Sequence, residues 1–363
     1  MRPKKSFFYV FRRPITKNLH LTKYNKNPHD LYYGLTKIKK FNLIYTDEVF
    51  KHKFLLFFQY YLNLFVSLFY KSGFSIIPTL LLIPKLNIAD CIFATVDTYG
   101  LPIALLKKLG FIKPKIILNT IGMYDGLIKS NNPISLFIIR NIINQIDHIV
   151  SGGSFSECKL LSKMLRIPIN RFSFIPFGID TQFFYKKSIK STNEILTIGA
   201  DIYRNWDLFF QVVKYFPNEK FRVITHKGLI KTTTLNNVIF EYNVNYETLR
   251  KRVWQSKFVL LLTKTNHYFS GQSTAFRCMS CEKPVIFTKT SGVGEYQFIN
   301  YKHCVVIPPY DFNSAILAIN KLNKSQSLRE KIGRNARKII KSKYNINMYA
   351  NKLEQVFKKI IYN

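Results

Sequence analysis

The sequence predicts an α/β protein made of two doubly wound parallel-sheet domains. The chain has 363 residues, which is more than a single hydrophobic core usually holds. Short apolar runs of strand length alternate with helix-like segments in two separate series, as expected for βα units. A polar, basic stretch at 186–193 lies between the two series and is the best candidate for a linker. We therefore expect one domain over residues 1–185 and a second over 186–345.

The composition indicates a folded protein that has anionic partners. Hydrophobic residues make up 47% of the chain, enough for substantial cores, so a disordered protein is excluded. Lys and Arg outnumber Asp and Glu by 55 to 20, which gives a formal net charge of +35. Such an excess repels itself unless phosphates, nucleic acid or an anionic membrane lie nearby. Because the basic residues are spread along the whole chain, part of the charge also reflects a general Lys-rich composition.

The cysteine pattern favours a reducing compartment. The chain has five cysteines, an odd number, and most lie far apart in the sequence. Cys278 and Cys281 have a metal-like spacing, but no second pair or nearby histidine pair completes a tetrahedral site, so no metal is expected. The first residues lead into a short apolar run without a small-residue cleavage site, so we expect no signal peptide and a cytoplasmic location.

The first series begins with an expected strand at 6–11, followed by a basic loop at 12–28. His29 and Asp30 precede an expected helix at 31–39, for which Asp30 is a candidate cap. The series then continues along the chain with expected strands at 42–45, 90–94, 114–118 and 148–151 and expected helices at 97–109, 134–145 and 154–165. A Gly-Gly pair at 152–153 lacks the pattern of a dinucleotide-binding fingerprint.

The most apolar segment, Phe54 to Tyr70, predicts a helix. Gln59, Asn63, Ser67 and then Lys71 recur every four residues and therefore share one face of it. The run is shorter than the roughly 20 apolar residues that span a bilayer. Two interpretations stay open: a helix buried in the first domain, or a helix in a membrane interface with neighbouring lysines on lipid phosphates. We expect burial of one part and membrane contact of the rest.

The second series repeats the βα alternation. Expected strands lie at 194–198, 221–225, 238–242, 258–262 and 284–287, and expected helices at 206–215, 246–255, 273–281, 313–322, 327–343 and 346–361. The loop at 264–272 joins an expected strand to an expected helix and ends in Ser270-Gly271-Gln272. Unpaired N–H groups and the positive end of the dipole at the start of a helix favour an anion, and Gly271 would allow a phosphate to come close.

Three runs in the second half resemble the nucleotide-sugar site of the retaining "group 1" (family 4) glycosyltransferases of the GT-B fold. The runs are SGQSTAFRCMSCEKPVI at 270–286, TKTSGVGEYQ at 288–297 and CVVIPPYD at 304–311. A Pro-x-Gly-x-Asp run at 176–180 with Phe184 is similar to the end of the first domain in the same class. The residues of the three runs that stand in register are Met279, Lys283, Pro284, Val285, Ile286, Gly292, Glu295, Pro308, Pro309 and Asp311.

The resemblance implies two Rossmann-like domains that face each other across a cleft, with a final helix at 346–363 packed back on the first domain. The second domain would bind a UDP- or GDP-linked sugar without a metal ion, and the first a glycan or lipid-linked acceptor, peripheral to a membrane. His29 and Asp30 are the candidate catalytic residues on the acceptor side. Glu295 would contact the sugar or the nucleotide. The residues expected to hold the donor diphosphate are Arg204, Lys264, Gly271, Gln272, Ser273 and Thr274.

The sequence departs from the family pattern at the donor site. Arg277 stands where the helix glutamate typically holds the donor ribose, and no glutamate lies upstream at 266–268. Ala200 replaces a usual arginine. Two functions therefore stay open: a retaining transferase, in which Arg277 is a donor-site residue, or a degenerate non-catalytic protein that acts as a binding or scaffold subunit. Nucleic acid is not expected as a partner, because no zinc finger, aromatic RNP pattern or basic zipper is present.

Overall fold

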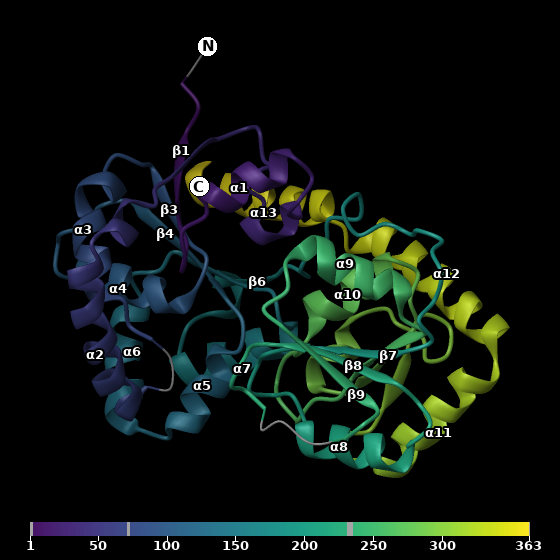
Figure 1. Ribbon diagram of the computed structural model, residues 1–363. Coiled ribbons are helices and arrows are strands. Elements are labelled where there is room, and N and C mark those ends of the chain that lie inside the picture. The colour runs from purple at the N-terminus through teal and green to yellow at the C-terminus, as the bar shows by residue number, and fades with distance from the viewer. Residues whose placement is uncertain (1–2, 71–72, 231–234, 363) are drawn as a thin grey trace. The chain divides into compact units, whose positions relative to one another are not determined.

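The computed structural model describes residues 3–70, 73–230 and 235–362 (Figure 1). The chain divides into two compact units. The N-terminal unit contains residues 1–21, 31–176 and 349–363, and the C-terminal unit contains residues 22–30 and 177–348. The segment 22–30 thus belongs to the second unit although it comes early in the sequence.

The N-terminal unit is built on a six-stranded parallel sheet with the strand order β2-β1-β3-β4-β5-β6. Each strand is a short apolar run, and the buried faces form one core with the flanking helices. The order reverses at β1, because β2 lies on one side of it and β3 on the other. The strands are β1 (Ser6–Val10), β2 (Asn42–Tyr45), β3 (Cys91–Ala94), β4 (Lys115–Thr120), β5 (His148–Ser151) and β6 (Phe172–Phe174).

Two of the expected elements near the N-terminus are wrong. The expected loop at 12–28 contains a helix, α1 (Thr16–Lys23). The expected helix at 31–39 is a 3₁₀ helix at His29–Tyr32 followed by turns. Tyr33 and Gly34 both have a left-handed backbone, with φ of 47° and 83°, so a right-handed helix cannot continue through them.

The other helices of this unit are α2 (Lys53–Phe69), α3 (Ile76–Leu86), α4 (Asp97–Lys108), α5 (Met123–Ser130), α6 (Pro133–Ile143) and α7 (Phe155–Leu165). The helix expected at 54–70 is confirmed as α2, and its polar side chains Gln59 and Asn63 share a face that points into the unit. Lys71, expected on the same face, lies outside the described residues. Within the part of the chain that the structure describes, no helix is long and apolar enough to cross a membrane.

The last helix, α13 (Ile346–Tyr362), contributes most of its length to the N-terminal unit. The ring of Phe357 stacks on Phe7 of β1, with 4.0 Å between centroids. Lys115 Nζ donates a hydrogen bond of 2.6 Å to the carbonyl of Ile360. These contacts fix the C-terminal helix to the sheet of the first unit.

The C-terminal unit has a second six-stranded parallel sheet, in the order β12-β11-β10-β7-β8-β9. The fold class predicted from the sequence, two doubly wound α/β domains, is therefore confirmed. In Figure 1, α9 and α10 lie on one face of this sheet and α8 and α11 on the other. The strands are β7 (Ile195–Ile198), β8 (Phe221–Thr225), β9 (Val238–Tyr242), β10 (Phe258–Leu261), β11 (Val285–Thr288) and β12 (Val305–Ile307). The helices are α8 (Trp206–Tyr215), α9 (Tyr246–Gln255), α10 (Gln272–Ser280), α11 (Phe312–Lys324) and α12 (Gln326–Lys343).

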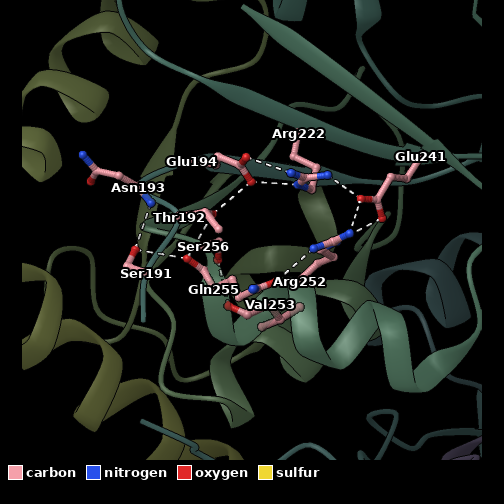
Figure 2. Close-up of polar contacts among 10 residues, drawn as sticks. All are labelled: Ser191, Thr192, Asn193, Glu194, Arg222, Glu241, Arg252, Val253, Gln255 and Ser256. Atoms are coloured by element: carbon pink, nitrogen blue, oxygen red, sulfur yellow. Dashed lines mark hydrogen bonds and ion pairs between the residues drawn. The ribbon is translucent and has the colours of Figure 1, made fainter. Parts of the chain in front are cut away.

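A chain of ion pairs joins three strands of this sheet to α9 (Figure 2). Arg222 on β8 binds both carboxylate oxygens of Glu194, which precedes β7, at 2.7 and 2.8 Å. Arg222 also pairs with Glu241 on β9, and Glu241 in turn pairs with Arg252 of α9 at 2.8 Å. The side chains are only 9–28% exposed. Because each buried charge has a partner, the network fixes α9 and the strands in one arrangement.

Candidate active site

The candidate site lies at the carboxyl end of β7, where the strand order of the second sheet reverses. Ligands of open parallel sheets bind at such a point, because the loops that follow the two neighbouring strands diverge there. The loops after β7 and β10 are tied together beside it. Asn205 N–H donates to the carbonyl of Leu262 at 3.0 Å, and Lys264 N–H donates to the carbonyl of Tyr203 at 2.7 Å. These bonds determine where Arg204 points.

The guanidinium of Arg204 is buried between two glycines. Its side chain is 3% exposed. A Cβ atom on Gly199 would lie 1.9 Å from Arg204 Nε, and one on Gly271 would lie 2.9 Å from each terminal nitrogen. Both positions therefore require glycine while Arg204 keeps this place. Gly271 also has a left-handed backbone, with φ of 78°.

Arg204 carries a buried charge that its surroundings only partly satisfy. Asp201 forms an ion pair with it, with 3.1 Å between Oδ2 and Nε. Neither Nε nor Nη1 has a hydrogen-bond partner among the described residues. Burial lowers the pKa of Arg204 below its usual value, although Asp201 opposes this shift. Since an unsatisfied buried donor costs free energy, the site favours an anionic oxygen that would accept these hydrogen bonds.

The first turn of α10 lies next to Arg204. Gly271 is the N-cap residue, and no side chain caps the helix. The N–H groups of Ser273 and Thr274 belong to this first turn, where a helix lacks internal acceptors and its dipole is positive. Gln272 N–H bonds to the carbonyl of Phe269, and its side chain donates to the Tyr296 hydroxyl. Gln272 therefore has a structural role here, and Ser273 and Thr274 are the better candidates for binding an anion.

A cavity of about 230 Å³ opens beside this turn within the C-terminal unit. It is smaller than the roughly 300–1,000 Å³ of sites that enclose a whole ligand, so it would take part of a larger molecule. Thr225, the last residue of β8, and His226 after it lie at its wall, and Thr225 Oγ1 is buried without a hydrogen-bond partner among the described residues. Other residues that line the cavity are Gly199, Ala200, Tyr246, Thr274 and Arg277.

Arg277 is held in the cavity wall by Asp30. Its Nε and Nη2 lie 3.0 and 2.9 Å from Oδ2 of Asp30, whose side chain is fully buried. The guanidinium also lies over the ring of Tyr246, 5.2 Å from its centroid. Burial opposes the charge on Arg277, but the pair with Asp30 raises the pKa of Arg277 above its usual value. Arg277 is therefore a fixed cation, where the family pattern has a carboxylate.

The remaining predicted residues divide into two groups. His29 and Asp30 both belong to the C-terminal unit, where the backbone N–H of His29 donates to Asp180 Oδ2 at 2.9 Å. Asp30 thereby joins the wall of the cavity through Arg277. Lys264 and Glu295 are half-buried, and neither is among the residues that line the cavity. Their predicted contacts with donor phosphate and sugar stay predictions.

Sequence reasoning missed the partners that position the two arginines. Asp201, three residues before Arg204, and Tyr246, at the start of α9, were not among the predicted site residues. Thr225 and His226 were also missed, although a signal was available. Thr225 ends a strand next to the central strand of the second series, and His226 follows it, at the end where such sheets bind ligands.

Comparisons with known proteins show which fold the whole chain has and which family one segment of it matches. Solved GT-B glycosyltransferases share the fold over nearly the whole chain. The Anabaena protein HepE, solved with UDP and glucose, has a TM-score of 0.71 and 13% identity over 98% of this chain and 100% of its own. Sucrose-phosphate synthase from Thermosynechococcus elongatus has a TM-score of 0.69 and 13% identity over 99% of this chain and 100% of its own.

A glycosyltransferase from Rickettsia africae has a TM-score of 0.62 and 12% identity over 99% of both chains. Residues 226–339 match the family "Glycosyl transferases group 1". No curated protein matches the sequence. The predicted resemblance is confirmed for the fold, which is GT-B, and the segment that matches the group 1 family includes α10 and the strands before and after it. Retention and family 4 membership stay predictions.

Proposed function

We propose that the protein is a glycosyltransferase that uses a nucleotide-diphospho-sugar and retains the anomeric configuration. The proposed acceptor is a lipid-linked or polysaccharide glycan at the cytoplasmic face of a membrane. The observation that supports this best is the buried Arg204, whose unsatisfied donors lie between Gly199 and Gly271 beside the first turn of α10. Structures of HepE with UDP and with UDP-glucose favour a UDP-linked donor as the first to test. A GDP-linked donor is the alternative.

The geometry is suited to stabilising a departing diphosphate. As the bond between sugar and phosphate breaks, negative charge grows on the phosphate oxygens, and fixed donors that meet this charge lower the barrier. Arg204 would supply charged donors, and the N–H groups of Ser273 and Thr274 would supply neutral ones. Lys264, in the loop before Gly271, would add a second positive charge. This arrangement would perform the electrostatic task that other enzymes give to a divalent metal ion.

One observation favours the second candidate function, a non-catalytic subunit that binds but does not transfer. Arg277 occupies the position of the ribose-binding glutamate, and its charge is already paired with Asp30. A guanidinium donates hydrogen bonds and cannot accept them from ribose hydroxyls as a carboxylate does. The donor must therefore be held differently from the family pattern, or sugar transfer is lost.

A ligand panel tests the donor site. The thermal stability of the purified protein is measured with UDP-, GDP-, ADP-, dTDP- and CMP-linked sugars. One donor class should stabilise the protein, by about 2.7 kcal/mol at a hundredfold excess over its Kd. Arg204→Met should abolish this stabilisation, whereas Arg334→Met, on the exposed face of α12, should keep it. If no donor stabilises the wild type, the proposed donor site is wrong.

A further inference from the structure

The helix α2 presents an unusual surface, because its aromatic face points to solvent. Several aromatic and leucine side chains on this helix are between 48% and 73% exposed, whereas such residues are normally buried. The rings contact one another, with 4.9 Å between the centroids of Phe54 and Phe58 and between those of Phe57 and Tyr61. The exposed side chains, which we call the α2 aromatic face, are Phe54, Phe57, Phe58, Tyr60, Tyr61, Leu64 and Phe65.

Hydrogen bonds on the opposite side fix this orientation. Gln59 is 4% exposed, and its side chain donates to the carbonyl of Phe74 at 2.8 Å and accepts from the N–H of Ile77 at 2.9 Å. Asn63 Oδ1 accepts from the N–H of Phe74 at 2.9 Å. A rotation of α2 that buried the aromatic rings would break these bonds and leave buried polar groups unsatisfied. The face is therefore held outward and needs an external partner.

The charges around the face indicate the kind of partner. Residues 49–89, which contain α2 and α3, include no Asp or Glu. Lys51 and Lys53 are exposed at the start of α2. On α3, which α2 contacts through Gln59, Leu80 and Leu81 are also 46% and 39% exposed. Glu48, which lies just before this range, is paired with Lys85. An apolar face with exposed Lys51 and Lys53 at its margin is complementary to an anionic lipid surface.

We propose that the α2 aromatic face docks on the interface of a bilayer that contains anionic phospholipids. The rings would enter the boundary between headgroups and acyl chains, where aromatic side chains are favoured, and Lys51 and Lys53 would contact lipid phosphates. A second copy of this chain is a poorer partner. A symmetric pair would bring the same lysines together in a protein whose formal net charge is already +35. This surface rests on the membrane location in the proposed function and names the part of the chain that would bind the lipid. Vesicle binding can be measured whether or not the protein transfers sugar.

Vesicle flotation of the full chain tests this surface. The wild type should bind vesicles made of equal parts phosphatidylcholine and phosphatidylglycerol, and bind phosphatidylcholine vesicles much less. Substituting Phe57→Ser together with Tyr61→Ser should weaken binding by about tenfold or more, because two apolar contacts are lost. Lys51→Gln with Lys53→Gln should weaken binding to the anionic vesicles only, again by about tenfold.

A matched control is Ile299→Ser with Leu317→Ser, which removes two exposed apolar side chains from the C-terminal unit and should bind like the wild type. Far-UV circular dichroism and the donor-induced thermal shift report whether each variant is folded. Absence of binding to both kinds of vesicle would overturn the proposal, as would unchanged binding of the Phe57 and Tyr61 double variant. A stable dimer that this double variant dissociates would also overturn it and make a second copy the partner.

Discussion

Replacing Arg204 should abolish donor binding without lowering the free energy of unfolding, because its guanidinium is buried with few hydrogen-bond partners. Arg204→Met removes the buried Nη1 donor, which has no partner among the described residues and costs about 1–3 kcal/mol. It also removes an ion pair with Asp201, whose side chain is 38% exposed, and such pairs contribute about 0–1 kcal/mol. The methionine side chain fills part of the space between Gly199 and Gly271. We therefore expect the ligand-free variant to be as stable as the wild type, or more stable by up to about 2 kcal/mol.

The matched comparison is Arg222→Met in the same unit. Arg222 is also mostly buried, but Glu194 and Glu241 satisfy its guanidinium (Figure 2). Removing it leaves Glu194 without its ion-pair partner and leaves Glu241 paired with Arg252 alone, which should destabilise the unit by about 3–5 kcal/mol. Urea denaturation of both variants, with and without the stabilising nucleotide sugar, measures the two effects. Arg222→Met should keep the ligand-induced stabilisation under conditions where it is folded, and Arg204→Met should lose it.

A different role for Arg204 follows if Arg204→Met is destabilised as much as Arg222→Met and still gains stability from the nucleotide sugar. That result would make Arg204 a structural residue whose hydrogen bonds matter to the fold. The diphosphate would then bind elsewhere in the unit.

Three further perturbations follow from buried groups. Asp30→Asn should destabilise the C-terminal unit by about 3–5 kcal/mol because Arg277 loses its partner, and adding Arg277→Met should restore much of the loss in a double-mutant cycle by urea denaturation. Gly271→Ala should cost about 1–2 kcal/mol from its left-handed backbone and weaken donor binding in a titration, because its Cβ meets Arg204; unchanged binding would contradict the geometry. Glu157 accepts hydrogen bonds from Gly122 N–H and Ser151 Oγ, and burial raises its pKa to about 7. The folded state then binds more protons than the unfolded state, so wild-type stability should fall by on the order of 3 kcal/mol as the pH rises from about 4.5 to 7, and Glu157→Gln should remove that fall.

The sequence was most informative about the sheets and the order of the elements. Apolar strands such as β8 and β9 were found to the residue, because short β-branched and aromatic runs between polar turns have few alternative structures. The helix expected at 31–39 was wrong, because its apolar and basic pattern gave no sign of the left-handed Tyr33 next to Gly34. Helix α3 was not predicted, since Pro84 within it argues against a helix.

The residue types at the candidate site could be predicted from the sequence, but the contacts between their side chains could not. The resemblance pointed to Arg204 and Gly271, but burial of the guanidinium depends on Gly199 and on the loop bonds of Asn205, which are tertiary features. The pair between Asp30 and Arg277 joins residues 247 positions apart, so no local pattern signals it. Period-four spacing predicted the polar face of α2, whereas its inward direction is set by backbone groups near Phe74.

The central claim, sugar transfer from a nucleotide sugar, is tested most directly by release of the nucleoside diphosphate. The purified protein is incubated with the donor that stabilises it and with membrane lipid extract as the source of acceptor, and the released diphosphate is measured. We expect release that depends on the extract, is lost in Arg204→Met and is kept in Arg334→Met. Tight donor binding without any release would contradict transfer and establish the non-catalytic function, with Arg277 as its structural cause.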